Sequence, residues 1–175
     1  AMYETYNHHG NALSNAVAAA GFDGPFRPIY RLDKDTSGLV VLARHQLSAA
    51  KLAGRVQKDY YAVVPGTYTG SGTVDAPIAH CPDSTVKRQV DPAGVRAVTH
   101  WEALGQQGGR TLLSVQLETG RTHQIRVHFA HLGTPLVGDS LYGTAPVGTR
   151  HLLHCKTIRL MHPVREEPVT FDCPF

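Results

Sequence analysis

The chain has 175 residues, of which 42% are hydrophobic and 18% charged, and this balance is typical of a globular domain with a core rather than of a disordered chain. The net charge of +3, with twelve Arg against five Lys, is compatible with a polyanionic partner but is equally common in enzymes that act on neutral ligands. The absence of a C-x-x-C pair, of an apolar run of roughly 20 residues and of a signal-peptide pattern argues against a thiolate zinc site, a disulfide framework and a membrane span, and favours a reducing cytoplasm.

Short strands dominate the predicted elements. Residues 1–10 are polar and are interpreted as an N-terminal arm or a cloning remnant, and residues 11–175 as a single domain. In chain order we expect a helix over Ala12–Ala20, a buried strand over Leu39–Ala43, a helix over Ser48–Gln57, strands over Tyr60–Val64, around Val74, over Val95–Leu104 and over Thr111–Leu117, a helix over Thr122–His131, and strands over Leu153–Met161 and Val169–Phe171. Because the strands rarely alternate with helices, the pattern predicts an α+β fold with a mixed, mainly antiparallel sheet.

Three polar clusters are candidates for chemistry. R-L-D-K-D-T-S-G at residues 31–38 precedes a hydrophobic run, a position where a loop can expose side chains to a substrate, although the same residues also suit an ordinary capped turn. E-T-G-R-T-H-Q-I-R at residues 118–126 places two arginines and a histidine at the start of a predicted helix, whose free amides favour anions. K-D-Y at residues 58–60 begins a predicted strand.

Taken together, these clusters resemble the RluA family of pseudouridine synthases. The catalytic-aspartate signature of that family is similar to R-L-D-K-D-T-S-G-L-V-V-L-A, its lysine-x-tyrosine strand to K-D-Y-Y-A-V-V-P-G, its long arginine motif to L-E-T-G-R-T-H-Q-I-R-V-H-F-A-H-L-G-T-P-L-V-G-D-S-L-Y-G, and its closing strand to H-L-L-H-C-K-T-I-R-L-M-H-P. The resemblance spans residues 28–175 in the family's order and spacing. It implies a mixed sheet with a central catalytic cleft flanked by helices.

The resemblance also implies which residues do the chemistry. Asp33 matches the aspartate on which pseudouridine synthases depend, Tyr60 the active-site tyrosine that packs on the target base, and Arg126 the arginine that pairs with the catalytic carboxylate. Three roles for Asp33 stay open: attack on the anomeric carbon, attack on the ring, or removal of a ribose proton. Because a drying cleft disfavours an ionised carboxylate and a nearby cation favours it, we expect Asp33 and Arg126 within about 6 Å of each other.

Substrate binding is implied for three basic residues. Arg31 matches the arginine two positions before the aspartate, Arg121 is a further arginine of the long motif, and Lys58 is the lysine of the lysine-x-tyrosine strand. The chain departs from the family in two main respects and one milder one. It has no Lys-Pro-x-Gly-Leu segment before the first helix and no small N-terminal RNA-binding domain, and Tyr30 stands where His is frequent.

The implied function is isomerisation of specific uridines to pseudouridine in structured rRNA or tRNA. The reaction needs no redox change or group transfer, so no cofactor and no metal are expected, and the protein is expected to be a monomer with RNA as its partner. A non-catalytic RNA-binding homologue of the same fold is the alternative, although binding alone gives no reason to keep a carboxylate facing a polyanion.

Two further alternatives belong to other classes. D-T-S-G at residues 35–38 is also the turn of aspartic proteases, but that chemistry needs two such carboxylates and this chain has one such turn. A metal enzyme is suggested by the pairs His128-x-x-His131 and His151-x-x-His154. No acidic or cysteine ligand stands at a characteristic spacing from them, so histidines of the core or the helix surface are the preferred interpretation.

Overall fold

The computed structural model describes residues 12–22 and 24–174. The predicted arm over residues 1–10 lies outside this part. The helices are α1 (Leu13–Ala19), α2 (Gln46–Leu52) and α3 (Gln124–His131), and the strands are β1 (Ser37–Gly38), β2 (Gln57–Pro65), β3 (Ser71–Asp75), β4 (Ile78–His80), β5 (Arg88–Val90), β6 (Val98–Gln107), β7 (Arg110–Leu117), β8 (Leu153–Met161) and β9 (Pro168–Asp172). None of these helices has the length and apolar character needed to cross a membrane.

A seven-stranded sheet forms the centre of the described fold. Its order is β1-β8-β2-β7-β6-β3, with β9 paired to β8, and every pairing is antiparallel except the short parallel one between β1 and β8. β4 and β5 form a separate hairpin. The predicted α+β class with a mainly antiparallel sheet is therefore confirmed.

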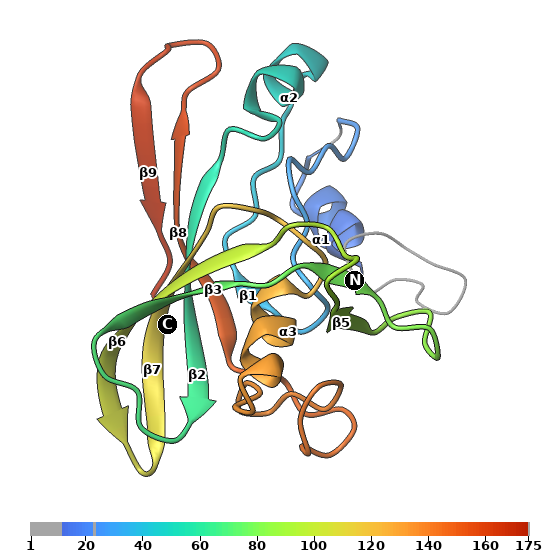
Figure 1. The fold of residues 1–175 in the computed structure, drawn as a ribbon. Coiled ribbons are helices and arrows are strands. Elements are labelled where there is room, and N and C mark those ends of the chain that lie inside the picture. Colours follow the sequence, from blue (N-terminus) through green and yellow to red (C-terminus); the bar gives the residue numbers. More distant parts are fainter. Residues whose placement is uncertain (1–11, 23, 175) are drawn as a thin grey trace.

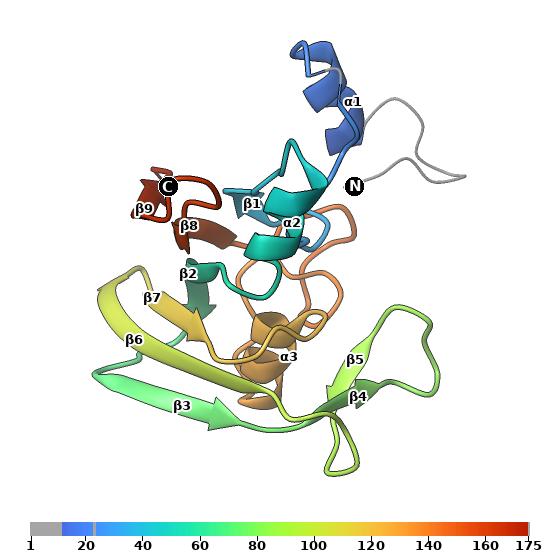
Figure 2. The ribbon, with the colours of Figure 1, turned by 90° about the horizontal axis from the view of Figure 1, so that it is seen from above.

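One face of the sheet is covered by α3, and Figure 2 shows β6, β7 and β2 curving around this helix, with the β4–β5 hairpin beyond it. Ile125 and Phe129 of α3 pack with Ala62, Val64 and Leu113 in the main core, because alternate residues of β2 and β7 point to this face. A second core cluster holds α3 against the hairpin region, and it contains Ile78, Ala97 and Val127. The helix is thus fixed from two sides, which suits an element that carries site residues.

Most predicted elements are present with ends shifted by up to a few residues, but one predicted strand is absent and one helix is clearly shorter. The prediction of a strand over Leu39–Ala43 is wrong. Apart from a hydrogen bond from the amide of Leu39 to the carbonyl of Cys155 (3.0 Å), this segment makes an isolated bridge between Pro28 and Leu42, because its neighbour is an irregular segment rich in proline. The regular strand pairing lies just before this segment, where β1 pairs with β8. The helix over Ser48–Gln57 is α2 and ends at Leu52, since Gly54 adopts a left-handed conformation (φ 70°) that stops it, and Gln57 already belongs to β2.

The β4–β5 hairpin is an addition to the prediction. Its strands have three residues each, too few for a period-two pattern to stand out in the sequence. The two predicted C-terminal strands are present as β8 and β9, and they pair as a long hairpin that projects beside α2 in Figure 1. Lys51 of α2 ties the two together through an ion pair with Glu166 (3.1 Å).

Candidate active site

A pocket of about 540 Å³ opens where the segment before β1, the start of β2 and the segment leading into α3 meet. Five of the six predicted site residues line it: Arg31, Asp33, Lys58, Tyr60 and Arg121. The sixth, Arg126, is buried beside it and contacts Asp33. The structure therefore brings together residues that are up to 95 positions apart in the chain, between Arg31 and Arg126.

The loop that carries Asp33 is fixed by a tight turn and a strand. The carbonyl of Asp33 accepts a hydrogen bond from the amide of Thr36 (3.1 Å), and Asp35 takes the left-handed conformation (φ 72°) that aspartate tolerates better than most residues. Gly38 then pairs with Cys155 of β8. Its φ of 107° favours glycine, and a Cβ at this position would overlap the backbone of Cys155, so only glycine fits.

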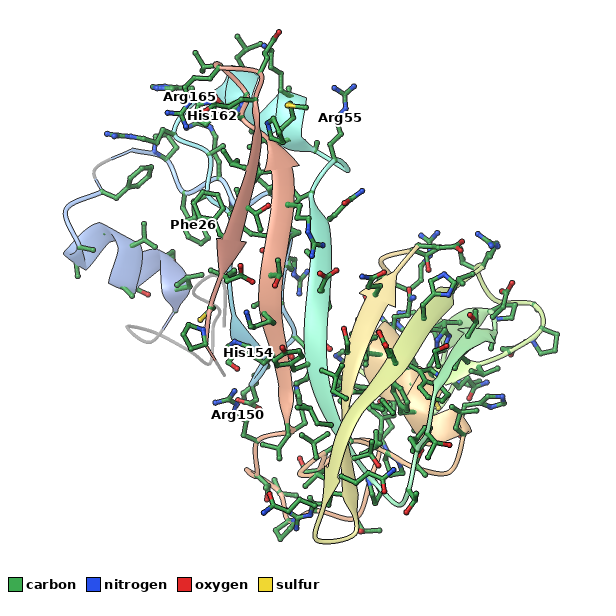
Figure 3. The ribbon with its side chains drawn as sticks, turned by 90° about the vertical axis from the view of Figure 1, so that its left-hand side faces the viewer. Phe26, Arg55, Arg150, His154, His162 and Arg165 are labelled. Carbon is green, nitrogen blue, oxygen red and sulfur yellow. The ribbon has the colours of Figure 1, made fainter. Side chains whose placement is uncertain are left out.

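Neighbouring hydroxyls of this loop are tied to histidines of the C-terminal segment. The Oγ1 of Thr36 lies 2.8 Å from Nε2 of His151, and the Oγ of Ser37 lies 2.7 Å from Nδ1 of His154 and also contacts Arg150. Figure 3 shows Arg150 and His154 at this end of β8. Within the described residues no three His, Cys, Asp or Glu side chains are grouped to hold a metal, and these histidines serve as hydrogen-bond partners of the loop.

Arg126 lies between two carboxylates. Its Nη1 is 3.6 Å from Oδ2 of Asp33, while its Nε and Nη2 donate to the two oxygens of Asp139 at 2.7 and 2.9 Å. The guanidinium also lies 5.0 Å from the centre of the Tyr142 ring, within cation–π range. The predicted contact between Asp33 and Arg126 is confirmed, and Asp139 is the stronger of the two partners by distance.

These contacts keep both Arg126 and Asp139 charged. Burial disfavours the charged form of Arg126, but the hydrogen bonds and the charge of Asp139, with a further contribution from Asp33, raise the pKa of Arg126 above its ordinary value. Burial also acts to raise the pKa of Asp139, but the hydrogen bonds from Arg126 and from the amides of Tyr142 and Leu141 prevail and lower it. Arg126 is therefore a permanent cation that is held in one orientation and faces Asp33.

Tyr60 lies at the floor of the pocket, with 6% of its surface exposed. Burial, reinforced by Cys155, Tyr30 and Asp33, raises the pKa of Tyr60 well above its ordinary value, so its hydroxyl stays protonated at neutral pH. Two residues along β2, the Nζ of Lys58 stands 4.5 Å from the centre of the Tyr30 ring, and burial lowers the pKa of this lysine. A neutral aromatic ring and an amine thus face the same space as the Asp33 carboxylate.

Arg31 and Arg121 stand at the pocket mouth with exposed side chains. Neither forms an ion pair with a described carboxylate, although Arg121 donates from Nε to the carbonyl of Arg96 (3.1 Å). Cations farther from the mouth, such as Arg159 and Lys156, are paired with Asp59 and Asp172. The mouth therefore keeps guanidinium groups free to meet phosphate.

The sequence profile of one known family, RNA pseudouridylate synthase, matches residues 10–131, which is more than half of the chain. The chain belongs to this family. The family predicted from the motifs is confirmed.

Relatives and solved structures agree with this assignment. A Bacillus subtilis protein described as an uncharacterized RNA pseudouridine synthase is 40% identical over 95% of this chain, which covers 63% of that protein. Ribosomal large subunit pseudouridine synthase D of Escherichia coli K12 is 40% identical over 83% of this chain and 51% of its own length. The structure of human RNA pseudouridylate synthase domain containing 1 superposes with a TM-score of 0.79 at 25% identity, over 94% of this chain and 74% of that one.

The chain thus spans about half to two thirds of the length of these curated relatives. The motif comparison did not identify Asp139, the buried ion-pair partner of Arg126, as a site residue. The sequence G-D-S-L-Y-G at residues 138–143 contains a signal for it. An aspartate side chain commonly forms a turn by accepting hydrogen bonds from the backbone amides two and three positions later. Nothing in the sequence placed that turn against Arg126.

Proposed function

We propose that this chain carries the active site of an RNA pseudouridine synthase, with Asp33 as the catalytic carboxylate. The observation that supports the proposal most is the contact of Asp33 with Arg126 at the wall of a pocket whose floor is Tyr60. The carboxylate is 23% exposed and opens towards the pocket while its cation is buried. A binding module has no need of this arrangement, since a carboxylate repels the phosphates of RNA.

The reaction sets four tasks for the site. The bond from C1′ of the ribose to N1 of uracil breaks, a bond from C1′ to C5 forms, the proton on C5 leaves, and N1 gains a proton, so the change is an isomerisation without a cofactor. The target must leave its stack, which costs a few kcal/mol and least in loops. Arg31 and Arg121 then hold the flipped backbone at the mouth, and the Tyr60 ring receives the base by stacking, worth about 1–3 kcal/mol.

Arg126 keeps Asp33 ionised when RNA dries the pocket. Its planar fork is already bound to Asp139, so the remaining Nη1 is presented to Asp33 without reorganisation. Lys58 is assigned to substrate binding as well, because it lines the same pocket and bears no ion pair with a described carboxylate.

The proposed substrate is a uridine in structured ribosomal or transfer RNA, and the proposed setting is the cytoplasm, with the protein acting as a monomer. The relatives include enzymes whose names refer to the ribosomal large subunit. The test is to map pseudouridines in the RNA of cells with and without the gene. Loss of one or more defined positions supports the proposal, and an unchanged map contradicts it.

A further inference from the structure

His123 lines the pocket with an unusual backbone conformation, and the proposed function assigns it no role. His123 precedes α3 in the left-handed conformation (φ 58°), a conformation that non-glycine residues adopt at a cost and that clusters at functional sites. It delays the helix, which was predicted from Thr122 and begins at Gln124. The side chain is half-buried and lines the pocket together with Asp33, Tyr60 and Arg121.

The two ring nitrogens of His123 have different surroundings. Nδ1 lies 2.8 Å from the hydroxyl oxygen of Tyr142, and the two rings meet edge to face with centres 5.6 Å apart. Nε2 makes no hydrogen bond to any residue that the structure describes, and no buried polar side-chain atom of that part lacks a partner, so Nε2 is open to the pocket. One nitrogen therefore orients the ring and the other is left for a ligand.

The hydrogen-bond pattern also fits a proton on Nε2. The hydroxyl of Tyr142 accepts from the amide of Arg88 at the start of β5 (2.9 Å), so its own proton is available to Nδ1 of His123. An imidazole that accepts at Nδ1 carries its proton on Nε2. Burial, with the charges of Arg126 and Arg88, lowers the pKa of His123 against the opposite pull of Asp33 and Asp139, which favours this neutral form at pH 7.

We propose that His123 is a substrate-contacting residue whose Nε2–H donates a hydrogen bond to a carbonyl oxygen of the target uracil. This inference rests on the proposed function. A uracil that has left its ribose carbon must be retained while it turns to present C5, and a fixed donor beside Asp33 and Tyr60 meets that need. Its anchor is Tyr142, whose ring also stacks on the Arg126 guanidinium, so donor and cation share one support.

The test pairs a protein change with a substrate change. His123→Asn keeps a residue that tolerates the left-handed backbone and an oxygen that can accept from Tyr142, but its amide is too short to replace Nε2. Wild type and variant are compared on three RNAs that carry uridine, 2-thiouridine or 4-thiouridine at the target, since sulfur is a poorer acceptor than oxygen. Thermal melting and RNA binding show whether the variant is folded, and His123→Gly, which removes the backbone strain, replaces it if it is not.

On uridine, we expect His123→Asn to lower turnover at least about tenfold with RNA binding retained, the range for loss of one positioned donor being about 10²–10³. On one of the two thio RNAs, turnover by the wild type should be slower than on uridine RNA. Turnover by the variant should be the same on both RNAs, because the protein change and the sulfur remove the same hydrogen bond. The proposed contact would be overturned if the variant lost the same further factor of turnover as the wild type on both thio RNAs. Full turnover by the variant on uridine RNA would also overturn it. A wild type that forms no pseudouridine on the uridine RNA would overturn the proposed function itself, and this inference with it.

Discussion

At the scale of single residues, the site depends on how one guanidinium is shared. Arg126 uses three nitrogens for two carboxylates, with the buried Asp139 fixing its plane and Asp33 receiving what remains. Asp33, Tyr60 and Arg126 were predictable because each stands in a motif with a recognisable chemistry. The pairing of Asp139 with Arg126 and the left-handed backbone of His123 were not, because the first depends on which loop folds against Arg126 and the second on a local turn.

Arg126→Lys should lower turnover by about 100-fold or more while RNA binding changes much less. A lysine is a point charge without the planar fork, so it cannot bridge Asp139 and Asp33 together. Single-turnover assays alongside titration of RNA binding give the two numbers separately. Equal losses in both would mean that Arg126 serves binding rather than the chemical step.

Asp139→Asn should destabilise the fold by about 3–5 kcal/mol at neutral pH, because a buried guanidinium loses its bidentate anion and keeps only the more distant Asp33, at 3.6 Å. The folded pKa of Asp139 is lowered, so its contribution is present above the unfolded value of about 3.9 and fades as pH falls through the lowered folded value. Melting temperatures of wild type and variant should therefore converge only in acid. Asp83→Asn, an exposed carboxylate without an ion pair among the described residues, is the matched control. A gap between Asp139→Asn and wild type that stays constant down to the acid limit would refute this role.

At the scale of elements, the strands and helices with clear periodicity were predictable from the sequence. The misplaced elements lie where a proline, or a residue in the left-handed conformation, decides the backbone. Gly54 ends α2 early, Gly38 moves the regular pairing from the hydrophobic run to the two residues of β1, and His123 delays α3. In each place the backbone was set by a tertiary contact or a left-handed residue, and a pattern of hydrophobic residues does not encode either.

Gly38→Ala should destabilise the protein by more than about 1 kcal/mol and lower turnover, because a Cβ would meet the backbone of Cys155 and shift the loop that carries Asp33. Gly105→Ala is the control, since its Cβ would enter open space. Chemical denaturation and turnover measured on both variants decide the matter. If the two alanine variants behave alike, the loop is not held by β1.

At the scale of the whole molecule, we expect RNA to approach from the side of the pocket mouth, where Arg31 and Arg121 are exposed. Arg31 and Arg121 at the pocket mouth have no carboxylate partners among the described residues, whereas Arg165 of the β8–β9 hairpin is paired with Glu167. Figure 3 shows Arg165 and His162 at the tip of this hairpin, at the opposite end from Arg150. The net charge alone does not indicate which face meets RNA, because that depends on how the chain folds.

RNA affinity should fall steeply with salt, and replacing both Arg31 and Arg121 by Gln should reduce the slope of log K against log salt by about 1.4, for two contacts to single-stranded phosphate. Arg165→Gln serves as the control and should leave the slope unchanged. Titrations at several salt concentrations provide the slopes. An unchanged slope in the double variant would place the RNA on another face.

Metal independence is a prediction at the same scale. Turnover on a short unstructured RNA should survive EDTA, because the reaction needs no Lewis acid and His151 and His154 are engaged with Thr36 and Ser37. Folded RNA is avoided since magnesium affects its structure. Activity that EDTA abolishes and zinc restores would instead support the metal-enzyme interpretation of the histidine pairs.

The most direct test of the central claim is pseudouridine formation by Asp33→Asn. The account predicts that this variant, with a melting temperature and an RNA affinity close to those of the wild type, forms no pseudouridine, because an amide has neither the charge nor the basicity of the carboxylate that Arg126 faces. The measurement is the pseudouridine content of a substrate RNA after incubation with each protein. Turnover above a tenth of the wild-type rate, in protein of verified sequence, would contradict the account.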